Sequence, residues 1–343
     1  MHSEFVLRQI EEKDLAGLKA LALSIKDGMT SLPPEESALE DRINHSLRSF
    51  DYRIKSAGAD HYLFVLESVP NAEVVGTAGI IARVGGFDPF YTYELKKERL
   101  VHPSLAIDKQ MDVLHLKLDH KGPSELCSLS LRPEYRRAGL GQLLSLSRFL
   151  FIASFPQRFD ERVIAELRGF TNDAGLSPFW EAVGRHFFNQ TFASADFLSG
   201  IGQKDFIRDL MPKYPIFVAM LPPEAQSVIG KVHSDAAPAL KILLAQGFKQ
   251  SDEVDIFDAG PLVTANRNEI RTIKNARFGN VTEIRPIDNG DAHIVAHVSL
   301  NFRACLGSVK ELGEDLVAIT PETARQLNVQ IGDQLIYVPL RSK

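Results

Sequence analysis

The stretch PEYRRAGLGQLL at residues 133–144 places two arginines and two glycines directly before an apolar run. The preceding residues 125–133, ELCSLSLRP, predict a strand that ends at Pro133, and residues 140–155 predict a long apolar helix. The glycines can serve an ordinary strand-to-helix turn that requires a positive φ. They can also let backbone N–H groups at the helix N-terminus approach an anion, with the arginines adding positive charge.

Two common phosphate-binding motifs do not fit the chain. A P-loop needs serine or threonine after Gly-Lys, but the pair Gly230 and Lys231 is followed by Val232. A dinucleotide fingerprint needs a third glycine where Leu144 stands. Residues 136–141, RRAGLG, instead match the pattern [Q/R]-x-x-G-x-[G/A], in which x is any residue.

This form, placed between a strand and a long helix, resembles the acyl-CoA loop of the GNAT acyltransferases. The resemblance implies a mixed α/β fold with a twisted sheet, in which successive N–H groups of the loop hold the pyrophosphate of coenzyme A. The candidate CoA-binding residues of the loop are Arg136, Arg137, Ala138, Gly139, Leu140, Gly141 and Gln142.

The composition is that of an ordinary globular protein. The chain has 343 residues, a formal net charge of -5 and 44% hydrophobic residues. The negative charge argues against general nucleic-acid binding, and no apolar run reaches the roughly 20 residues needed to span a bilayer. Two cysteines give neither a disulfide framework nor a zinc motif. We therefore expect a cytoplasmic protein without nucleic-acid or membrane partners, without a bound metal or permanently bound cofactor, and of homo-oligomeric state.

The hydrophobic patterns predict alternating helices and strands along most of the chain. Residues 86–110 are aromatic and irregular, which suggests an inserted flap. We expect strands over 5–8 and 163–170, helices over 15–25, 34–50 and 177–188, and a hairpin over 61–85. These are followed by a strand–helix–helix–strand unit over 215–260, a polar connector over 264–280 and a β-rich tail. The expected division is a GNAT-like acyl-CoA-binding domain over 1–200, a second α/β unit completing the site over 201–265 and a small C-terminal β subdomain over 280–343.

Further stretches resemble one family, the arginine N-succinyltransferases. They are TSLP at 30–33, SELCSLSLRP at 124–133, SPFWEAVGRHFF at 177–188, DFIRDLMPKYPI at 205–216, VIGKVH at 228–233 and DIFDAGP at 255–261. The resemblance implies transfer of succinyl from succinyl-CoA, as co-substrate, to the α-amino group of L-arginine, in the catabolism of arginine to glutamate and succinate. One departure is Phe217, where relatives commonly have tyrosine.

The same resemblance implies two site residues. It places a histidine proton donor at His233 and a succinyl-CoA contact at Leu129. The attacking amine must lose a proton and the departing thiolate must gain one, and a histidine exchanges protons near neutral pH. The backbone N–H of Leu129 can hold the thioester oxygen as negative charge develops. A structural histidine near a helix end is the alternative.

The substrates also require charged partners. The guanidinium of arginine needs a carboxylate, for which Glu166, Asp255 and Asp258 are candidates. The succinyl carboxylate needs a cation, for which Arg168 and Arg185 are candidates. Charged residues of this kind are more often surface or structural charges, which is the alternative for each of these five.

Other groupings have structural interpretations. His115, Asp119 and His120 have near metal-ligand spacing, but a solvated turn before Gly122 explains them. The functional alternatives are an acetyl-CoA-dependent N-acetyltransferase acting on another amine and a catalytically silent acyl-CoA or amino-acid sensor on the same fold. The sequence leaves arginine or ornithine preference open.

Overall fold

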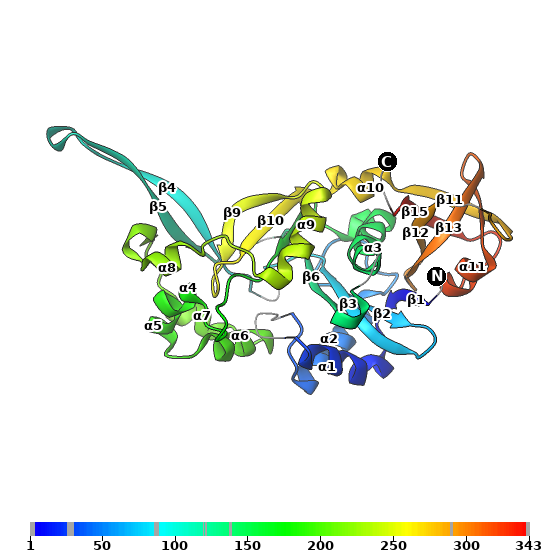
Figure 1. Ribbon diagram of the computed structural model, residues 1–343, viewed down its shortest axis with the longest axis horizontal. Helices are drawn as coiled ribbons and strands as arrows, with labels where there is room; N and C mark the ends of the chain where they lie inside the picture. Colours follow the sequence, from blue (N-terminus) through cyan, green and yellow to red (C-terminus); the bar gives the residue numbers. More distant parts are fainter. Residues whose placement is uncertain are drawn as a thin grey trace.

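The computed structural model describes residues 4–25, 31–85, 89–118, 120, 122–136, 139–288 and 291–340. The molecule is elongated: a β-hairpin arm projects from one end, and the C-terminal strands form the other end (Figure 1). One continuous sheet joins these ends, and outside the C-terminal strands its order is β1-β2-β3-β6-β7-β10-β9-β4-β5-β8. No helix in the described part of the chain is long and apolar enough to cross a bilayer.

The strands of this sheet are short in the middle and long in the arm. Their bounds are β1 Phe5–Gln9, β2 His61–Ser68, β3 Glu73–Ile81, β4 Thr92–His102, β5 Ile107–Lys117, β6 Ser124–Leu131, β7 Arg162–Glu166, β8 Ile216–Phe217, β9 Lys249–Asp255 and β10 Pro261–Asn266. Neighbouring pairs are antiparallel except β6 and β7, which are parallel. The mixed α/β fold class expected from the sequence is confirmed.

Helices cover both faces of β2 and β3. Alternate side chains of a strand point to opposite faces, so Phe64 packs in a cluster with the long helix α3 (Leu140–Ser154), while Leu63 and Val65 pack with α1 (Leu15–Leu23) and α2 (Glu36–Ser49). Helix α3 is buried on nearly all sides, as expected from its continuous apolar sequence. This packing fixes the start of α3 beside the end of β6.

The segment expected as an inserted flap over residues 86–110 does project from the body of the molecule, but it is a regular hairpin. The described part of this segment belongs to a regular hairpin of β4 and β5, whose register runs from Thr92 opposite Lys117 to His102 opposite Ile107. The segment PSL at 103–105 forms the turn as a 3-10 helix. The hairpin is the projecting arm in Figure 1, and its outer half is exposed on both faces, so its sequence carries no apolar periodicity.

The helix expected over 177–188 is interrupted. It is divided at Val183 into α4 (Pro178–Ala182) and α5 (Gly184–Phe188). A Cβ at Gly184 would lie 2.3 Å from ring atoms of Trp180, so the indole packs directly against that backbone. The remaining helices of this half are α6 Phe192–Gly200, α7 Asp205–Leu210, α8 Pro223–Gln226 and α9 Ala237–Ala245.

The C-terminal strands close into a barrel. Within residues 277–339, the pairings β12-β15-β11-β14-β13 are completed by a contact of β13 with β12, and β13 also pairs with β1 of the main sheet. The elements are α10 Arg271–Asn275, β11 Arg277–Ile284, β12 Ala292–His297, β13 Arg303–Gly313, β14 Leu316–Ile319, α11 Pro321–Leu327 and β15 Gln334–Pro339. The expected polar connector therefore contains the end of β10, the helix α10 and the start of β11. The division into three units stays a prediction.

Candidate active site

The parallel strands β6 and β7 separate soon after they pair. Only Ser124 with Val163 and Glu125 with Ile164 are in register, whereas β6 continues to Leu131. Both strands run in the same direction, so Leu129 and Arg168 each lie four residues beyond the last pair, on opposite sides of the separation. Backbone groups of β6 therefore face a region without a neighbouring strand.

A bulge lies on β6 at this separation. Ser128 has a φ of 50°, and the register with β3 shifts between Thr77 and Gly79. Among the described residues, Ser128 and Leu129 have no register partner in β3 or β7. The bulged residue is held by Ser31, whose hydroxyl accepts a hydrogen bond from the Ser128 backbone N–H at 3.1 Å. Bulges of this kind re-aim backbone groups next to active sites.

The glycine turn forms the start of α3, as the sequence predicts. Gly139 is the N-cap with a φ of 90°, a conformation that favours glycine. A Cβ at Gly141 would meet no atom within 4 Å, so protein packing alone does not require glycine at that position. The side chains of Arg136 and Gln142 are exposed, and Leu140 is buried. Arg137 and Ala138 lie outside the described residues.

A groove of about 1310 Å³ is lined by this turn, α3, α10 and the barrel. Gly139 and Gln142 are among its lining residues, together with the basic residues Arg271, Lys274 and Arg277. Lys274 pairs with Glu269 and Arg277 with Glu311, while no carboxylate in the described part of the chain pairs with Arg271. These basic residues are not among the candidates from the sequence because they lie in the segment interpreted as a connector. Their clustering in RTIKNAR at 271–277 is the sequence feature that indicates a basic surface.

The three candidate carboxylates gather at the ends of β7 and β9. Asp255 accepts backbone N–H groups from Phe257 and Asp258, and the two oxygens of Asp258 accept those of Gly169 and Gly260. In contrast, Oε1 of Glu166 is buried and has no hydrogen-bond partner. Burial raises the pKa of Glu166 well above its usual value, and the carboxyl group of Asp255 raises it further. Two of the carboxylates thus accept backbone N–H groups, whereas Oε1 of the third has no partner.

Arg168 and His233 are linked through their backbones. The N–H of His233 donates to the carbonyl oxygen of Arg168 at 2.8 Å, and Gly169 forms an isolated bridge with Val232. Nε of Arg168 is buried without a hydrogen-bond partner. Nδ1 of His233 accepts the backbone N–H of Asp235 at 3.1 Å and lies 3.7 Å from the Asp235 carboxylate. The histidine therefore lies beside the end of β7, next to the carboxylate cluster.

Other candidate residues lie in different settings. Arg185 is exposed on α5 and pairs with Glu181 at 2.5 Å, and no contact brings it to this cluster. His115 does not lie in a turn: it is on β5, 3.4 Å from Glu98. His120 is buried 3.2 Å from the Thr92 hydroxyl, and Asp119 lies outside the described residues. No group of three or more His, Cys, Asp or Glu in the described ranges could hold a metal ion.

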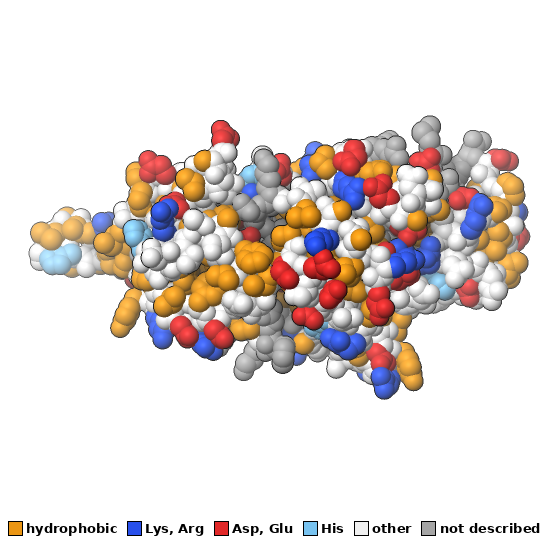
Figure 2. All heavy atoms as spheres, turned by 90° about the horizontal axis from the view of Figure 1, so that it is seen from below, with side chains coloured by type: hydrophobic (Ala, Val, Ile, Leu, Met, Phe, Trp, Pro, Cys, Tyr) orange, Lys and Arg blue, Asp and Glu red, His pale blue; other side chains and the backbone are white. Residues whose placement is uncertain are grey.

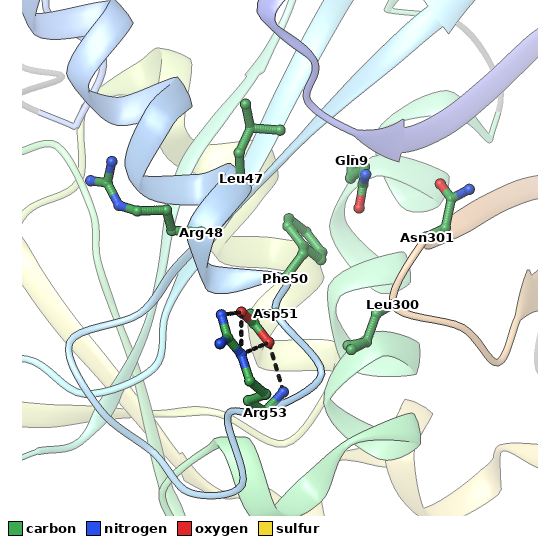
Figure 3. A pocket seen from close by; sticks show the side chains of 8 residues that line it. All are labelled: Gln9, Leu47, Arg48, Phe50, Asp51, Arg53, Leu300 and Asn301. Atoms are coloured by element: carbon green, nitrogen blue, oxygen red, sulfur yellow. Dashed lines mark hydrogen bonds and ion pairs between the residues drawn. The ribbon is translucent and has the colours of Figure 1, made fainter.

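A second pocket lies at the end of α2. Its volume is about 500 Å³, and Asp51 and Arg53 at its mouth bond to each other rather than to anything in the pocket (Figure 3). The Arg53 guanidinium lowers the pKa of Asp51 to about 2. This pocket contains none of the sequence-predicted site residues. The turn, the bulge and the carboxylate cluster are therefore the candidate active site.

Comparisons with known proteins agree over the whole chain. The family model described as the arginine N-succinyltransferase beta subunit matches residues 5–272, and that of its C-terminal domain matches residues 279–339. The chain belongs to the arginine N-succinyltransferase family. An arginine N-succinyltransferase of Yersinia pestis (strain Pestoides F) is 43% identical over 344 residues, with 97% of each chain covered. A family member from Enterobacter sp. (strain 638) is 43% identical, with 98% of this chain and 97% of that protein covered.

A solved structure also matches this family member over its full length. It is the arginine/ornithine succinyltransferase subunit AI from Pseudomonas aeruginosa, with a TM-score of 0.90 and 33% identity over 100% of both chains. The family that the sequence motifs indicated is therefore confirmed.

Proposed function

We propose that this chain transfers the succinyl group of succinyl-CoA to the α-amino group of L-arginine. The observation that carries the proposal is that three features lie where β6 and β7 separate: a bulge without a strand partner, a carboxylate with one buried oxygen that lacks a hydrogen-bond partner, and a histidine bonded to the end of β7. The bulge suits a thioester oxygen, the carboxylate suits a guanidinium and the histidine suits proton transfer. The family assignment supplies the reaction that needs all three.

The donor side uses the loop and the groove. N–H groups at the start of α3 would bind the pyrophosphate, assisted by Arg136, and Gly141 leaves room for that approach. The basic residues Arg271 and Lys274 of the groove would hold a further phosphate of coenzyme A. The thioester then lies between β6 and β7, where the backbone N–H of Leu129 would donate to its carbonyl oxygen.

The acceptor side uses the end of β7. Glu166, whose Oε1 has no partner, would bind the guanidinium of arginine, with Asp255 and Asp258 shaping the loop beside it. Arg168, whose Nε has no partner, would bind a substrate carboxylate. Arg185 is a weaker candidate for this role because Glu181 already pairs with it.

The proton passes through His233. The α-amine attacks the thioester carbon, the C–S bond breaks and the amine loses one proton, while the coenzyme A thiolate gains one. We assign both transfers to Nε2 of His233, because Asp235 contacts Nδ1. The Asp235 carboxylate can accept from a protonated Nδ1, and its backbone N–H can donate to a bare one, so the ring has a partner at Nδ1 in either state.

The test is release of free thiol by the purified chain. Succinyl-CoA and acetyl-CoA are each offered with arginine and with ornithine. Rapid thiol release with succinyl-CoA and arginine is expected, with the acylated amino acid identified by mass. Preference for acetyl-CoA would indicate an N-acetyltransferase, and binding without turnover would indicate a sensor; either result overturns the proposal.

We also propose that the chain forms a homo-oligomer. We further propose that it is located in the cytoplasm and acts in arginine catabolism. The outer part of the β4–β5 arm exposes Leu100, Val101, Leu105 and Ile107, and apolar atoms gather on the arm in Figure 2. Such a surface is suited to a second copy. Light scattering, which measures the mass of the assembly in solution, tests the oligomer. Leu105→Lys should lower this mass because a charge on the arm disfavours association, and a monomeric wild type would contradict the proposal.

A further inference from the structure

Helix α3 buries a positive charge among apolar side chains. Arg148 is 1% exposed. Its Nε donates to the backbone oxygen of Ser145 at 3.2 Å, and Nη2 donates to the Ser145 hydroxyl at 3.1 Å. Nη1 reaches the carbonyl oxygen of Cys127 on β6 at 3.5 Å, which is long for a hydrogen bond. The side chain is thus positioned by its own helix and aimed at β6.

The charge of Arg148 lacks an acidic partner in the described part of the chain. A guanidinium has five N–H donors, and three bonds use three of them, so donors on Nη1 and Nη2 remain. Arg8, another buried arginine, pairs with both Asp14 and Glu67. Burial without a carboxylate lowers the pKa of Arg148 to about 10, so the group still carries its charge at neutral pH. A buried, incompletely bonded cation is costly unless an anion compensates it.

The position of Arg148 is next to the proposed thioester site. Its contact, Cys127, precedes the bulged Ser128, and Leu129 follows. The Cα atoms of Cys127 and Leu129 are at most roughly 7 Å apart. The succinyl group extends roughly 4 Å from its thioester carbon to its distal carboxyl carbon. A thioester held at Leu129 can therefore direct its distal carboxylate toward Arg148.

We infer that Arg148 binds the distal carboxylate of the succinyl group and so selects a dicarboxylic four-carbon acyl donor. The inference rests on the proposed function. The carboxylate takes the Nη1 and Nη2 donors in a paired geometry and displaces the long contact to Cys127. Arg168 is then left for the α-carboxylate of the amino acid, which gives each substrate carboxylate its own arginine.

The test compares succinyl-CoA with butyryl-CoA, which has a methyl group in place of the distal carboxylate. In Arg148→Gln, kcat/KM for succinyl-CoA should fall at least about 30-fold, since one partner of a buried charge pair is lost. The value for butyryl-CoA should stay near that of the wild type. Arg158→Gln is the matched control: Arg158 is also buried, but its bonds go to Ser49, Asp51 and Tyr62, so donor preference should be unchanged.

The outcomes separate the two proposals. A wild type that does not turn over succinyl-CoA overturns the proposed function. A wild type that does, together with an Arg148→Gln variant of unchanged donor preference, overturns the role of Arg148 alone. If Arg148→Gln does not fold, Arg148→Lys and Ser145→Ala replace it. The first keeps a charge without the forked geometry, and the second removes the Nη2 bond. Each should lower the succinyl-to-butyryl ratio, and an unchanged ratio in both overturns the inference.

Discussion

The backbone N–H of His233 donates a 2.8 Å hydrogen bond to the carbonyl oxygen of Arg168. This bond fastens the loop that carries the histidine to the end of β7, although 65 positions separate the two residues in sequence. The histidine thereby lies at the same end of the sheet as Glu166, the last residue of β7. The proposed proton-transfer and guanidinium-binding groups thus lie at the end of one strand.

Replacing His233 tests its role in proton transfer. His233→Ala and His233→Asn should both lower kcat by about 10²–10⁴-fold, because neither side chain exchanges protons near neutral pH. Asparagine can still accept the backbone N–H of Asp235, so it should keep the stability that alanine loses, about 0.5–2 kcal/mol. Affinity for succinyl-CoA should change little in either variant.

Steady-state kinetics and thermal unfolding on the same preparations provide the check. His115→Asn on β5 is the control and should leave kcat unchanged. A folded His233→Asn enzyme with wild-type kcat would show that the histidine is structural.

Replacing Gly141 tests the proposed phosphate-binding role of the turn before α3. The residue is helical, and a Cβ there meets no protein atom within 4 Å, so Gly141→Ala should stabilise the free protein by up to about 1 kcal/mol. The same methyl group should weaken coenzyme A binding by blocking close approach to the backbone. Thermal unfolding measures the first effect and calorimetric titration the second, each against Gly313→Ala, whose Cβ makes an ordinary 3.9 Å contact. Wild-type affinity for coenzyme A in Gly141→Ala would place the phosphates elsewhere.

Replacing Gly139 should act differently. Its φ of 90° and the 3.2 Å approach of a Cβ to Leu306 mean that Gly139→Val strains the free protein as well. Loss of both stability and coenzyme A affinity is expected, measured by the same titration and by thermal unfolding.

The sequence predicts the elements whose structure is decided locally. Glycine, helix and strand signals around 125–155 are consistent with one another, and the structure reproduces β6, the turn at Gly139 and α3 within a few residues. The arm formed by β4 and β5 was missed because its outer residues face solvent on both sides and lack periodicity. The interruption at Val183 depends on the Trp180 ring packing against Gly184, which no local pattern indicates.

The site was only partly predictable for the same reason. Glu166, Asp255 and Asp258 are equivalent in sequence, but Asp258 accepts the backbone N–H groups of the distant Gly169 and of its own turn at Gly260, whereas Oε1 of Glu166 has no partner. Arg148 lies in the middle of an apolar helix, and only the structure shows that it is buried without an acidic partner in the described part of the chain. Which charge is satisfied depends on the folded path of the turn after β9 and on the approach of Gly169, and the sequence does not show either.

Replacing Glu166 tests recognition of the substrate charge. Citrulline keeps the shape of arginine without its charge and should be a poor acceptor for the wild type, by at least about tenfold in kcat/KM. Glu166→Gln should lose activity toward arginine and discriminate less between the two. Asp258→Asn, which cannot accept both backbone N–H groups, should instead lose about 1–3 kcal/mol of stability. Equal rates with arginine and citrulline in the wild type would rule out charge recognition.

The raised pKa of Glu166 predicts a proton linked to arginine binding. Burial raises this pKa above the usual 4.5, so between 4.5 and the raised value the folded chain holds a proton that the unfolded chain has lost. The free energy of unfolding should therefore fall as the pH rises through that window. A guanidinium binds the ionised carboxylate, so arginine should release this proton and stabilise the enzyme more at higher pH.

Calorimetry in buffers of different ionisation enthalpy counts the protons released when arginine binds. The α-amino group of arginine can also lose a proton, so the decisive quantity is the difference between the wild type and Glu166→Gln. The wild type should release more, and the Tm of Glu166→Gln should fall less between pH 5 and pH 8, because glutamine does not ionise. Equal proton release in the two proteins would show that Glu166 does not bind the guanidinium as an anion.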